Sequence, residues 1–315
     1  MRKYLQISNY INIKFKNNFI KLEKTKVQIK KKKIIIYSVD LFDEKNHKIW
    51  IKDKLKDKFI IKFSSNNPDY LIYNIFGEKH LNEKYNKSIK IAIYTENQIP
   101  DFNQADYAIG QAHINYLDRY FKFPIFLWYD FKNFYKIRQA ILKNHIRTKF
   151  CAAVISNNLT TNGFRLNFIN ELNKYKKVDM GGRFNNNIGY QINDKIEFFS
   201  SYKFSISMEN SEGDGYISEK IIHSFISGTI PIYYGDAMID EYINPKSFIL
   251  IKNEKDIKEK IEYIIKIDKN DEIYKSLLKE NIILDTNISN KIEKEQKEFL
   301  HHIFEQDKLK AFRRN

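Results

Sequence analysis

The stretch YKFSISMENS at residues 202–211, together with GYISEK at 215–220 and GTIPIYYG at 228–235, decides the fold of this chain. Its pattern predicts a buried strand, a glycine-rich turn, a helix that begins near Ser218 and a second buried strand. Serine is a favoured helix N-cap, and a helix N-terminus at the carboxyl end of a strand is a ready site for phosphate groups. The stretch therefore predicts both a strand–turn–helix unit and a place for an anion.

Two charged residues in the first turn of this predicted helix are candidate ligands. Lys220 could pair with a diphosphate, and Glu219 could accept hydrogen bonds from sugar hydroxyls. The alternative is a purely structural helix, because the macrodipole by itself favours Glu219 at such a position. The residue types alone leave both interpretations open.

Short apolar runs rich in β-branched residues recur on both sides of this stretch, and most are separated by lengths that suit helices. The runs lie at 34–39, 70–73, 89–94, 107–110, 150–155, 204–208, 230–234 and 247–251. This alternation predicts an α/β fold with largely parallel sheets. We expect two α/β units in tandem, organised as a basic N-terminal extension over 1–33, a first unit over 34–145, a second unit over 146–285 and a helical basic tail over 286–315.

Composition narrows the classes of function. The 315 residues are 43% hydrophobic, and a net charge of +15 comes from 54 Lys and Arg against 39 Asp and Glu. This charge fits a lysine-rich composition without functional meaning, attraction to an anionic nucleotide-sugar or membrane surface, or nucleic-acid binding. Nucleic-acid binding ranks lowest, because no zinc-finger, RNP-type or helix-turn-helix pattern accompanies the charge.

The cellular compartment is constrained by one cysteine and by the lack of long apolar runs. Cys151 lies in the apolar run FCAAVI at 150–155 and has no partner for an intramolecular disulfide. The start of the chain has no signal-peptide core, and no apolar run approaches the about 20 residues that a membrane span needs. We therefore expect a cytoplasmic protein without a transmembrane segment.

Several common catalytic signatures are missing from the sequence. G-x-S-x-G, the Walker A loop and G-x-G-x-x-G do not occur, and the seven histidines show no zinc-like spacing. The D-x-D pair, through which one large class of glycosyltransferases holds a diphosphate by a metal ion, is also missing. We expect no metal site.

The motifs around the glycine-rich turn, in their order, resemble the signature of the α-1,3/4-fucosyltransferases (glycosyltransferase family 10). The similarity is greatest to bacterial members that act on lipopolysaccharide or Lewis-type glycans. The family pattern F-E-N-S, Gly-Tyr, T-E-K and T-I-P-I-Y-W-G corresponds to MENS, GY, SEK and TIPIYYG here, and NPKSFI at 244–249 is similar to its N-P-K-S-F-V.

The first half of the chain carries further, looser matches to the same family. DFN at 101–103, DYAIG at 106–110 and DRY at 118–120 are similar to family motifs. YTEN at 94–97 resembles the family's T-G-E-N, although the glycine is missing here. The resemblance extends over residues 34–250.

The resemblance implies a GT-B fold, in which two Rossmann-like domains face a cleft, with GDP-fucose on the C-terminal domain and the acceptor on the N-terminal one. The implied reaction is an inverting α-1,3-fucosyl transfer from GDP-β-L-fucose to a hydroxyl of an N-acetylglucosamine- or N-acetyllactosamine-type glycan. Inversion in one displacement needs a base on the acceptor side and charge stabilisation on the leaving side. Glu96, the glutamate of the T-G-E-N-like motif, is the expected base; without the family it would pass for a solvated loop carboxylate.

The resemblance places the donor site in the second unit. Arg165 and Lys220 are expected to bind the diphosphate, Asn210 and Tyr216 to line the nucleotide pocket, and Glu219 to hold hydroxyls or stabilise a developing oxocarbenium charge. Two cations in place of a metal imply that no cofactor is required, although Mn²⁺ or Mg²⁺ could stimulate the reaction. From the residues alone, Arg165 could equally be a surface arginine of a helix.

The expected partners are GDP-fucose and a glycan acceptor, without nucleic acid. The basic residues at 308–315 resemble the membrane-associated tails of some bacterial relatives, so peripheral contact with the inner membrane is one expectation, and a solvated charged tail is the favoured alternative. Three other functions stay open: a GT-B transferase for another nucleotide-sugar, a basic nucleic-acid-binding protein, and an inactive relative that only binds glycans.

Overall fold

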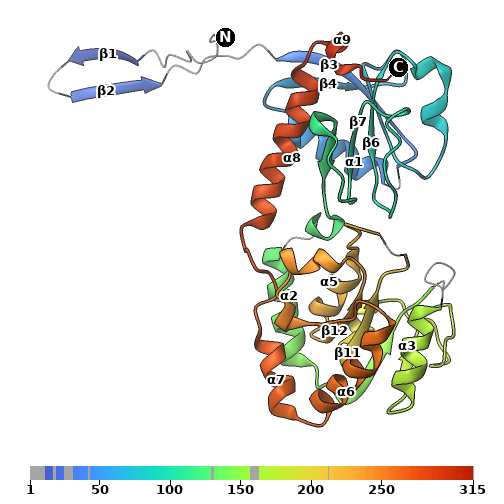
Figure 1. The fold of residues 1–315 in the computed structure, drawn as a ribbon. Coiled ribbons are helices and arrows are strands. Elements are labelled where there is room, and N and C mark those ends of the chain that lie inside the picture. Colours follow the sequence, from blue (N-terminus) through green and yellow to red (C-terminus); the bar gives the residue numbers. More distant parts are fainter. Residues whose placement is uncertain are drawn as a thin grey trace.

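The computed structural model describes residues 11–16, 19–24, 31–41, 43–128, 131–156, 163–211 and 213–314. Within these residues, two parallel β-sheets form the two lobes that stand one above the other in Figure 1. A separate antiparallel pair, β1 (Ile11–Lys16) and β2 (Phe19–Lys24), falls within the expected N-terminal extension, whose remaining residues up to 30 lie outside the described part.

The first lobe contains six parallel strands. Their order in the sheet is β4 (Phe59–Phe63), β3 (Lys32–Val39), β5 (Tyr70–Tyr73), β6 (Ile89–Ile93), β7 (Tyr107–Gly110) and β8 (Tyr120–Lys122). Every residue of β5, β6 and β7 is buried, as expected for parallel strands that are covered on both faces. The short helices η1 (Lys79–Leu81), η2 (Glu83–Tyr85), η3 (Leu117–Arg119) and η4 (Ile125–Trp128) lie in the connections.

Helix α1 (Glu44–Leu55) packs on the first sheet. It begins after Asp43, whose carboxylate accepts a hydrogen bond from the N–H of Asn46 at 3.0 Å, and it buries Ile51 and Leu55 in the same apolar cluster as β3. The cap fixes the start of the helix and so places its first two turns at the carboxyl end of β3.

The second lobe contains five parallel strands. Their order is β10 (Val178–Met180), β9 (Lys149–Ala153), β11 (Tyr202–Met208), β12 (Ile230–Tyr234) and β13 (Ile249–Leu250). The surrounding helices are α3 (Phe164–Asn173), α4 (Lys195–Phe199), α5 (Glu219–Ile226), α6 (Ile257–Asp268), α7 (Asp271–Lys279), η5 (Ala237–Glu241), η6 (Pro245–Ser247) and η7 (Glu254–Asp256). All five residues of β12 are buried, and β11 pairs with β9 on one side and β12 on the other.

The two sheets confirm the predicted α/β class with two Rossmann-like units. All eight apolar runs identified in the sequence contain a strand. Three strands of these two sheets were not predicted, namely β4, β8 and β10, and two of these are only three residues long. Strands of this length carry too little pattern to be separated from loops.

Two helices link the lobes in a way that the sequence did not indicate. α2 (Phe131–Asn144), assigned to the first unit by the expected division at 145, packs on α5 of the second lobe, and Arg138 donates a hydrogen bond to the carbonyl of Phe225. α8 (Ile288–Glu305) does the reverse: it leaves the second lobe and runs along the first (Figure 1). Its Phe304 ring lies 4.3 Å from that of Tyr70, measured between centroids.

The basic residues at 308–314 are attached to the first lobe by ion pairs, although most of them are exposed. α9 (Lys308–Ala311) buries Ala311, and the guanidinium of Arg314 reaches the fully buried carboxylate of Asp106 at 3.0 Å. Lys308 pairs with Asp69, and Arg313 pairs with Asp118 at 2.7 Å. Most of the tail is nevertheless exposed to solvent, as the favoured alternative expected, but its charges pair with acidic groups of the first lobe instead of standing alone. Membrane contact stays a prediction.

No helix in the described part of the chain is both long enough and apolar enough to cross a membrane.

Candidate active site

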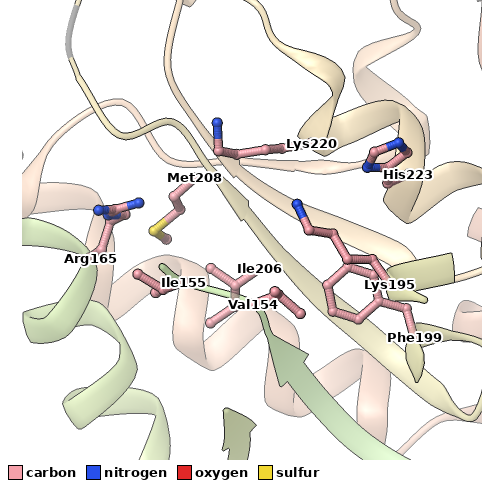
Figure 2. Close-up of a pocket in the computed structure, with 9 residues that line it drawn as sticks. All are labelled: Val154, Ile155, Arg165, Lys195, Phe199, Ile206, Met208, Lys220 and His223. Carbon is pink, nitrogen blue, oxygen red and sulfur yellow. The ribbon is translucent and has the colours of Figure 1, made fainter. Parts of the chain in front are cut away.

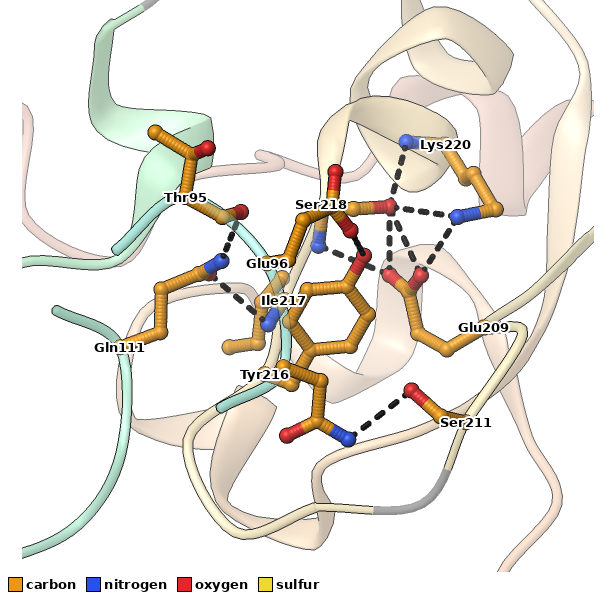
Figure 3. A network of polar contacts seen from close by, with 10 residues as sticks. Thr95, Glu96, Gln111, Glu209, Ser211, Tyr216, Ile217, Ser218 and Lys220 are labelled. Atoms are coloured by element: carbon orange, nitrogen blue, oxygen red, sulfur yellow. Dashed lines mark hydrogen bonds and ion pairs between the residues drawn. The ribbon is translucent and has the colours of Figure 1, made fainter. Parts of the chain in front are cut away.

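The N-terminal end of α5, its head, is held in place by a carboxylate that is not exposed to solvent. Glu209 follows β11 directly and is 0% exposed. Its side chain accepts hydrogen bonds from the N–H of Ser218 at 2.8 Å, from the hydroxyl of Ser218 at 2.7 Å and from the ammonium of Lys220 at 2.8 Å (Figure 3). Ser218 is the N-cap of α5, as predicted. Glu209 thus ties the end of the strand to the start of the helix.

The electrostatics of this carboxylate are balanced between two effects. Burial raises the pKa of Glu209, while the charge of Lys220 and the hydrogen bonds from Lys220 and Ser218 oppose that rise. Sequence reasoning quoted Glu209 as part of a motif but gave it no role. A glutamate directly after an apolar strand and eleven positions before a lysine does not by itself reveal that the two meet.

A small cationic pocket lies beside this head. It has a volume of about 20 Å³ and includes Arg165, Lys195, Lys220 and His223 in its lining. Figure 2 shows these side chains around the apolar residues Ile206 and Met208. Three cationic side chains and a histidine beside one apolar floor give this small pocket the charge that attracts a phosphate oxygen.

Two members of the pocket add to what the sequence indicated. Arg165 is only 3% exposed, so the alternative of a surface arginine is wrong. Burial lowers its pKa, and the charge of Glu209 partly compensates. His223 was not predicted. Burial lowers its pKa, the charge of Glu219 opposes this change and the charge of Lys195 adds to it, so the neutral ring is favoured.

A much larger cavity opens on the other side of the α5 head, between the lobes. Its volume is about 910 Å³, and Glu96, Tyr216 and Glu219 belong to its lining. Glu96 comes from the loop after β6, and Glu219 is the first residue of α5. The structure therefore brings the two predicted catalytic carboxylates to one cavity, while the next residue, Lys220, faces the cationic pocket.

The loop of Glu96 is held against the second lobe by direct contacts. The hydroxyl of Tyr216 donates to the carboxylate of Glu96 at 3.2 Å (Figure 3). Burial and then the neighbouring carboxylates, chiefly Glu209, raise the pKa of Tyr216, so its hydroxyl keeps its proton. Tyr216, expected to line the nucleotide pocket, lines the larger cavity and contacts Glu96.

A buried amide reinforces the same junction. The side chain of Gln111 is 2% exposed, donates to the carbonyl of Thr95 at 3.0 Å and accepts from the N–H of Ile217 at 3.3 Å. Gly215 makes the approach possible, because its φ is +95° and a Cβ there would lie 2.0 Å from the carbonyl oxygen of Gln111. A glycine is therefore required where the two lobes touch.

The predicted site residue Asn210 follows Glu209 and lies in neither lining set. The remaining five predicted residues divide into the two cavities, with Arg165 and Lys220 on the cationic side and Glu96, Tyr216 and Glu219 on the other. In the described residues, no group of three His, Cys, Asp or Glu side chains could hold a metal ion.

Two family models match this chain, one after the other along the sequence. The model described as "Alpha-(1,3)-fucosyltransferase FucT N-terminal domain" matches residues 34–129, and "Glycosyltransferase family 10 (fucosyltransferase) C-term" matches residues 144–300. The chain belongs to glycosyltransferase family 10. The resemblance inferred from the motifs is thereby confirmed.

Relatives of this family 10 chain agree in sequence and in fold. The α-(1,3)-fucosyltransferase FucT of Helicobacter pylori is 31% identical over 248 residues, which are 68% of this chain and 51% of that protein. The family 10 chain thus spans about half the length of this relative. A solved α1,3-fucosyltransferase is 26% identical with a TM-score of 0.73, over 91% of this chain and 94% of that one.

A second solved structure, of an α1,3-fucosyltransferase with GDP-fucose, is 24% identical with a TM-score of 0.70, over 90% of this chain and 94% of that one. The expected GT-B-like fold of the family 10 chain is confirmed.

Proposed function

We propose that this chain is a GDP-fucose-dependent α-1,3-fucosyltransferase. It would move fucose from GDP-β-L-fucose, with inversion, to a hydroxyl of an N-acetylglucosamine- or N-acetyllactosamine-type glycan. Family membership supports the class of reaction. The relative solved with GDP-fucose supports the choice of donor.

The observation that carries the proposal is the position of the Glu96 carboxylate. It lines the interlobe cavity with Glu219, and Lys220, the next residue of α5, lines the cationic pocket. A base and a phosphate-binding cation therefore lie on opposite sides of one helix start. In-line displacement needs this order: attacking oxygen, anomeric carbon and leaving diphosphate in succession.

The roles follow from this order. Glu96 accepts the proton of the acceptor hydroxyl as the oxygen attacks the anomeric carbon. The bond from that carbon to the diphosphate breaks, and GDP leaves with the bonding electrons, stabilised by Lys220 and Arg165. Glu219 holds donor hydroxyls or stabilises the positive charge that develops on the sugar. Two permanent cations at the leaving group make a metal ion unnecessary for this step.

The test is acceptor-dependent GDP release, measured in EDTA with GDP-fucose and N-acetyllactosamine. The chain is compared with Glu96→Gln, which removes the base but keeps its size. Glu83→Gln, on an exposed turn of the same lobe, is the matched control. We expect a loss of about 10²-fold or more for Glu96→Gln and none for the control.

Other outcomes are equally informative. Full activity of Glu96→Gln removes Glu96 from the role of base. Activity that returns only when Mn²⁺ or Mg²⁺ replaces EDTA overturns the metal-free mechanism. Turnover with another nucleotide-sugar but not with GDP-fucose replaces the donor assignment.

A further inference from the structure

A histidine of the first lobe contacts a buried carboxylate of the second. Nε2 of His113, in the loop after β7, lies 2.9 Å from Oδ2 of Asp236, in the loop after β12. The side chain of Asp236 is only 3% exposed, and that of His113 is 19% exposed. Both residues lie just beyond motifs, DYAIG at 106–110 and TIPIYYG at 229–235, so the family pattern did not point to them.

The hydrogen bonds of the His113 ring fix where its proton lies. The ammonium of Lys122, at the end of β8, is 2.8 Å from Nδ1. An ammonium can only donate, so Nδ1 accepts and the ring proton lies on Nε2, from which it is donated to Asp236. A neutral imidazole thus joins a cation of the first lobe to a buried carboxylate of the second. Because a buried carboxylate needs partners, this contact favours the arrangement of the lobes that forms it.

Both ends of this contact are fixed within the second lobe. Oδ1 of Asp236 accepts a hydrogen bond from the N–H of Met238, in η5, at 3.1 Å. The backbone N–H of His113 donates to the carbonyl of Asp214, in the turn before α5, at 3.1 Å. One residue of the first lobe is therefore attached to the loops that follow β11 and β12, which are neighbours in the second sheet.

The loop that contains His113 is also connected to the proposed base. Two residues before His113, the side chain of Gln111 donates to the carbonyl of Thr95 at 3.0 Å (Figure 3). Glu96 directly follows Thr95 in the chain. The strands that precede these two loops, β6 and β7, pair with each other in the first sheet. A displacement of the His113 loop would therefore move the carboxylate of Glu96 relative to the start of α5.

We propose that His113 is a positioning residue for fucosyl transfer: bound to Asp236, it holds the first lobe in the orientation in which Glu96 faces the head of α5. The inference rests on the proposed function, and it adds a residue that lies outside both lining sets. The attacking oxygen and the anomeric carbon react only within a narrow range of distances, and a shift of about 1 Å can cost about 10²-fold in rate. A contact away from the reacting atoms can therefore control kcat.

A double-mutant cycle tests whether His113 acts through Glu96. His113→Ala and His113→Gln are each made alone and together with Glu96→Gln, and acceptor-dependent GDP release is measured with GDP-fucose and N-acetyllactosamine. We expect kcat to fall about tenfold in His113→Ala and to be largely restored in His113→Gln, whose amide can donate to Asp236. In the Glu96→Gln background, His113→Ala should change the rate by less than about twofold, because the group that it positions is gone.

The distance between the lobes tests the same inference without catalysis. Spin labels on Glu83→Cys in the first lobe and Lys275→Cys in the second report this distance with GDP bound. Both sites are exposed, and the natural Cys151 is buried and should not react. We expect the distribution of distances to widen in His113→Ala. The affinity for GDP should stay within about twofold of the parent, because its proposed ligands all lie in the second lobe.

His302→Ala is the matched control. Nε2 of His302 lies 3.0 Å from a carboxylate oxygen of Asp118, so this pair resembles the first in chemistry but joins α8 to the first lobe. Neither the distance distribution nor kcat should change in this variant. Should His113→Ala fail to fold, His113→Asn takes its place, because its amide is too short to reach Asp236.

The outcomes separate this inference from the proposed function. An unchanged distance distribution in His113→Ala overturns the inference, whether or not the chain transfers fucose. An equal fold-change in kcat with and without Glu96→Gln also overturns it, because His113 then acts independently of Glu96. A wider distribution in His113→Ala, with a parent chain that shows no acceptor-dependent GDP release, supports the attachment of the lobes through His113 and contradicts the proposed reaction instead.

Discussion

Glu209 has a structural role within the motif MENS at 208–211. It is fully buried, and it satisfies the first N–H of α5, the cap hydroxyl and the ammonium of Lys220 together. Without it, Lys220 would lose the partner that fixes its side chain next to the cationic pocket. Glu209 therefore fixes the side chain of Lys220, which we propose as a ligand of the diphosphate.

Tyr216→Phe tests whether the contact across the lobes matters for transfer. The variant removes the hydroxyl that donates to Glu96 at 3.2 Å and keeps the ring. We expect kcat for transfer to fall about tenfold, because the carboxylate loses a fixed donor that orients it, which corresponds to about 1.4 kcal/mol. Tyr190→Phe, at an exposed tyrosine of the second lobe, should leave kcat unchanged. A Tyr216→Phe rate equal to that of the parent contradicts the prediction.

His47 predicts how stability depends on pH. Its pKa is about 4 in the folded chain because of burial, against about 6.5 when unfolded. The unfolded state therefore binds the proton first as pH falls, and stability is lost between about 6.5 and 4, by about 2–3 kcal/mol. His47→Asn should flatten the dependence of the urea midpoint on pH in this window, and His145→Asn, at an exposed histidine, should not. Equal slopes for both variants would rule out His47 as the source.

At the scale of elements, local pattern was sufficient for much of the fold. β-branched runs predicted the central strands of both sheets, and Ser218 with its charged successors predicted the start of α5 within one residue. The same reasoning missed β4, β8 and β10, and it did not indicate that α2, inside the expected first unit, packs on α5. Which helix a surface packs against depends on contacts from distant parts of the chain, and these leave no mark in a short window.

The residues of the candidate site also divide into those that local motifs predicted and those that depend on distant contacts. Family motifs identified Glu96, Glu219, Arg165 and Lys220, and the structure places them in two adjoining cavities. Glu209, Gln111 and His223 were missed, because their importance comes from burial and from partners elsewhere in the chain. The position of Tyr216 beside Glu96 was likewise invisible, since the two are 120 residues apart.

Gly215→Ala tests the junction between the turn before α5 and the loop at Gln111. A Cβ at Gly215 would lie 2.0 Å from the Gln111 carbonyl oxygen, and φ is +95°. Gly189→Ala is the matched control, because its φ of +82° imposes the backbone strain alone and nothing lies within 4 Å of its Cβ. We expect about 1 kcal/mol of destabilisation at Gly189 and clearly more at Gly215, together with loss of transfer. Equal urea midpoints for the two variants contradict a steric role for Gly215.

The whole molecule is held together by the C-terminal segment as much as by the interlobe contacts. α8 places Phe304 in the apolar cluster of the first sheet, and Arg314 pairs with the buried Asp106. The backbone N–H groups of Arg313 and Arg314 donate to the same carboxylate at 2.6 Å and 2.9 Å. Residues at the end of the chain therefore complete the core of the lobe at its beginning.

Arg314→Ala and Arg313→Ala form a matched pair for this interaction. Arg314 and Asp106 have side chains only 7% and 0% exposed, so removing the arginine leaves a buried charge with fewer partners and should cost about 3 kcal/mol. Arg313 and Asp118 are 34% and 37% exposed, so their loss should cost less than about 1 kcal/mol. Urea unfolding measures both. A smaller loss for Arg314→Ala than for Arg313→Ala would show that the tail does not stabilise the first lobe through Asp106.

The return of α8 to the first lobe has a consequence for synthesis on the ribosome. A nascent chain emerges from its N-terminus and usually folds domain by domain in that order. Here the first sheet emerges early, but the ring of Phe304 and the guanidinium of Arg314 that cover it are made only after the whole second lobe. The second lobe, from α2 to α7, is contiguous in the sequence. It can therefore pack before the residues that complete the core of the first lobe have been made. Translation order and folding order are therefore reversed, and the half made first is the half that is finished last.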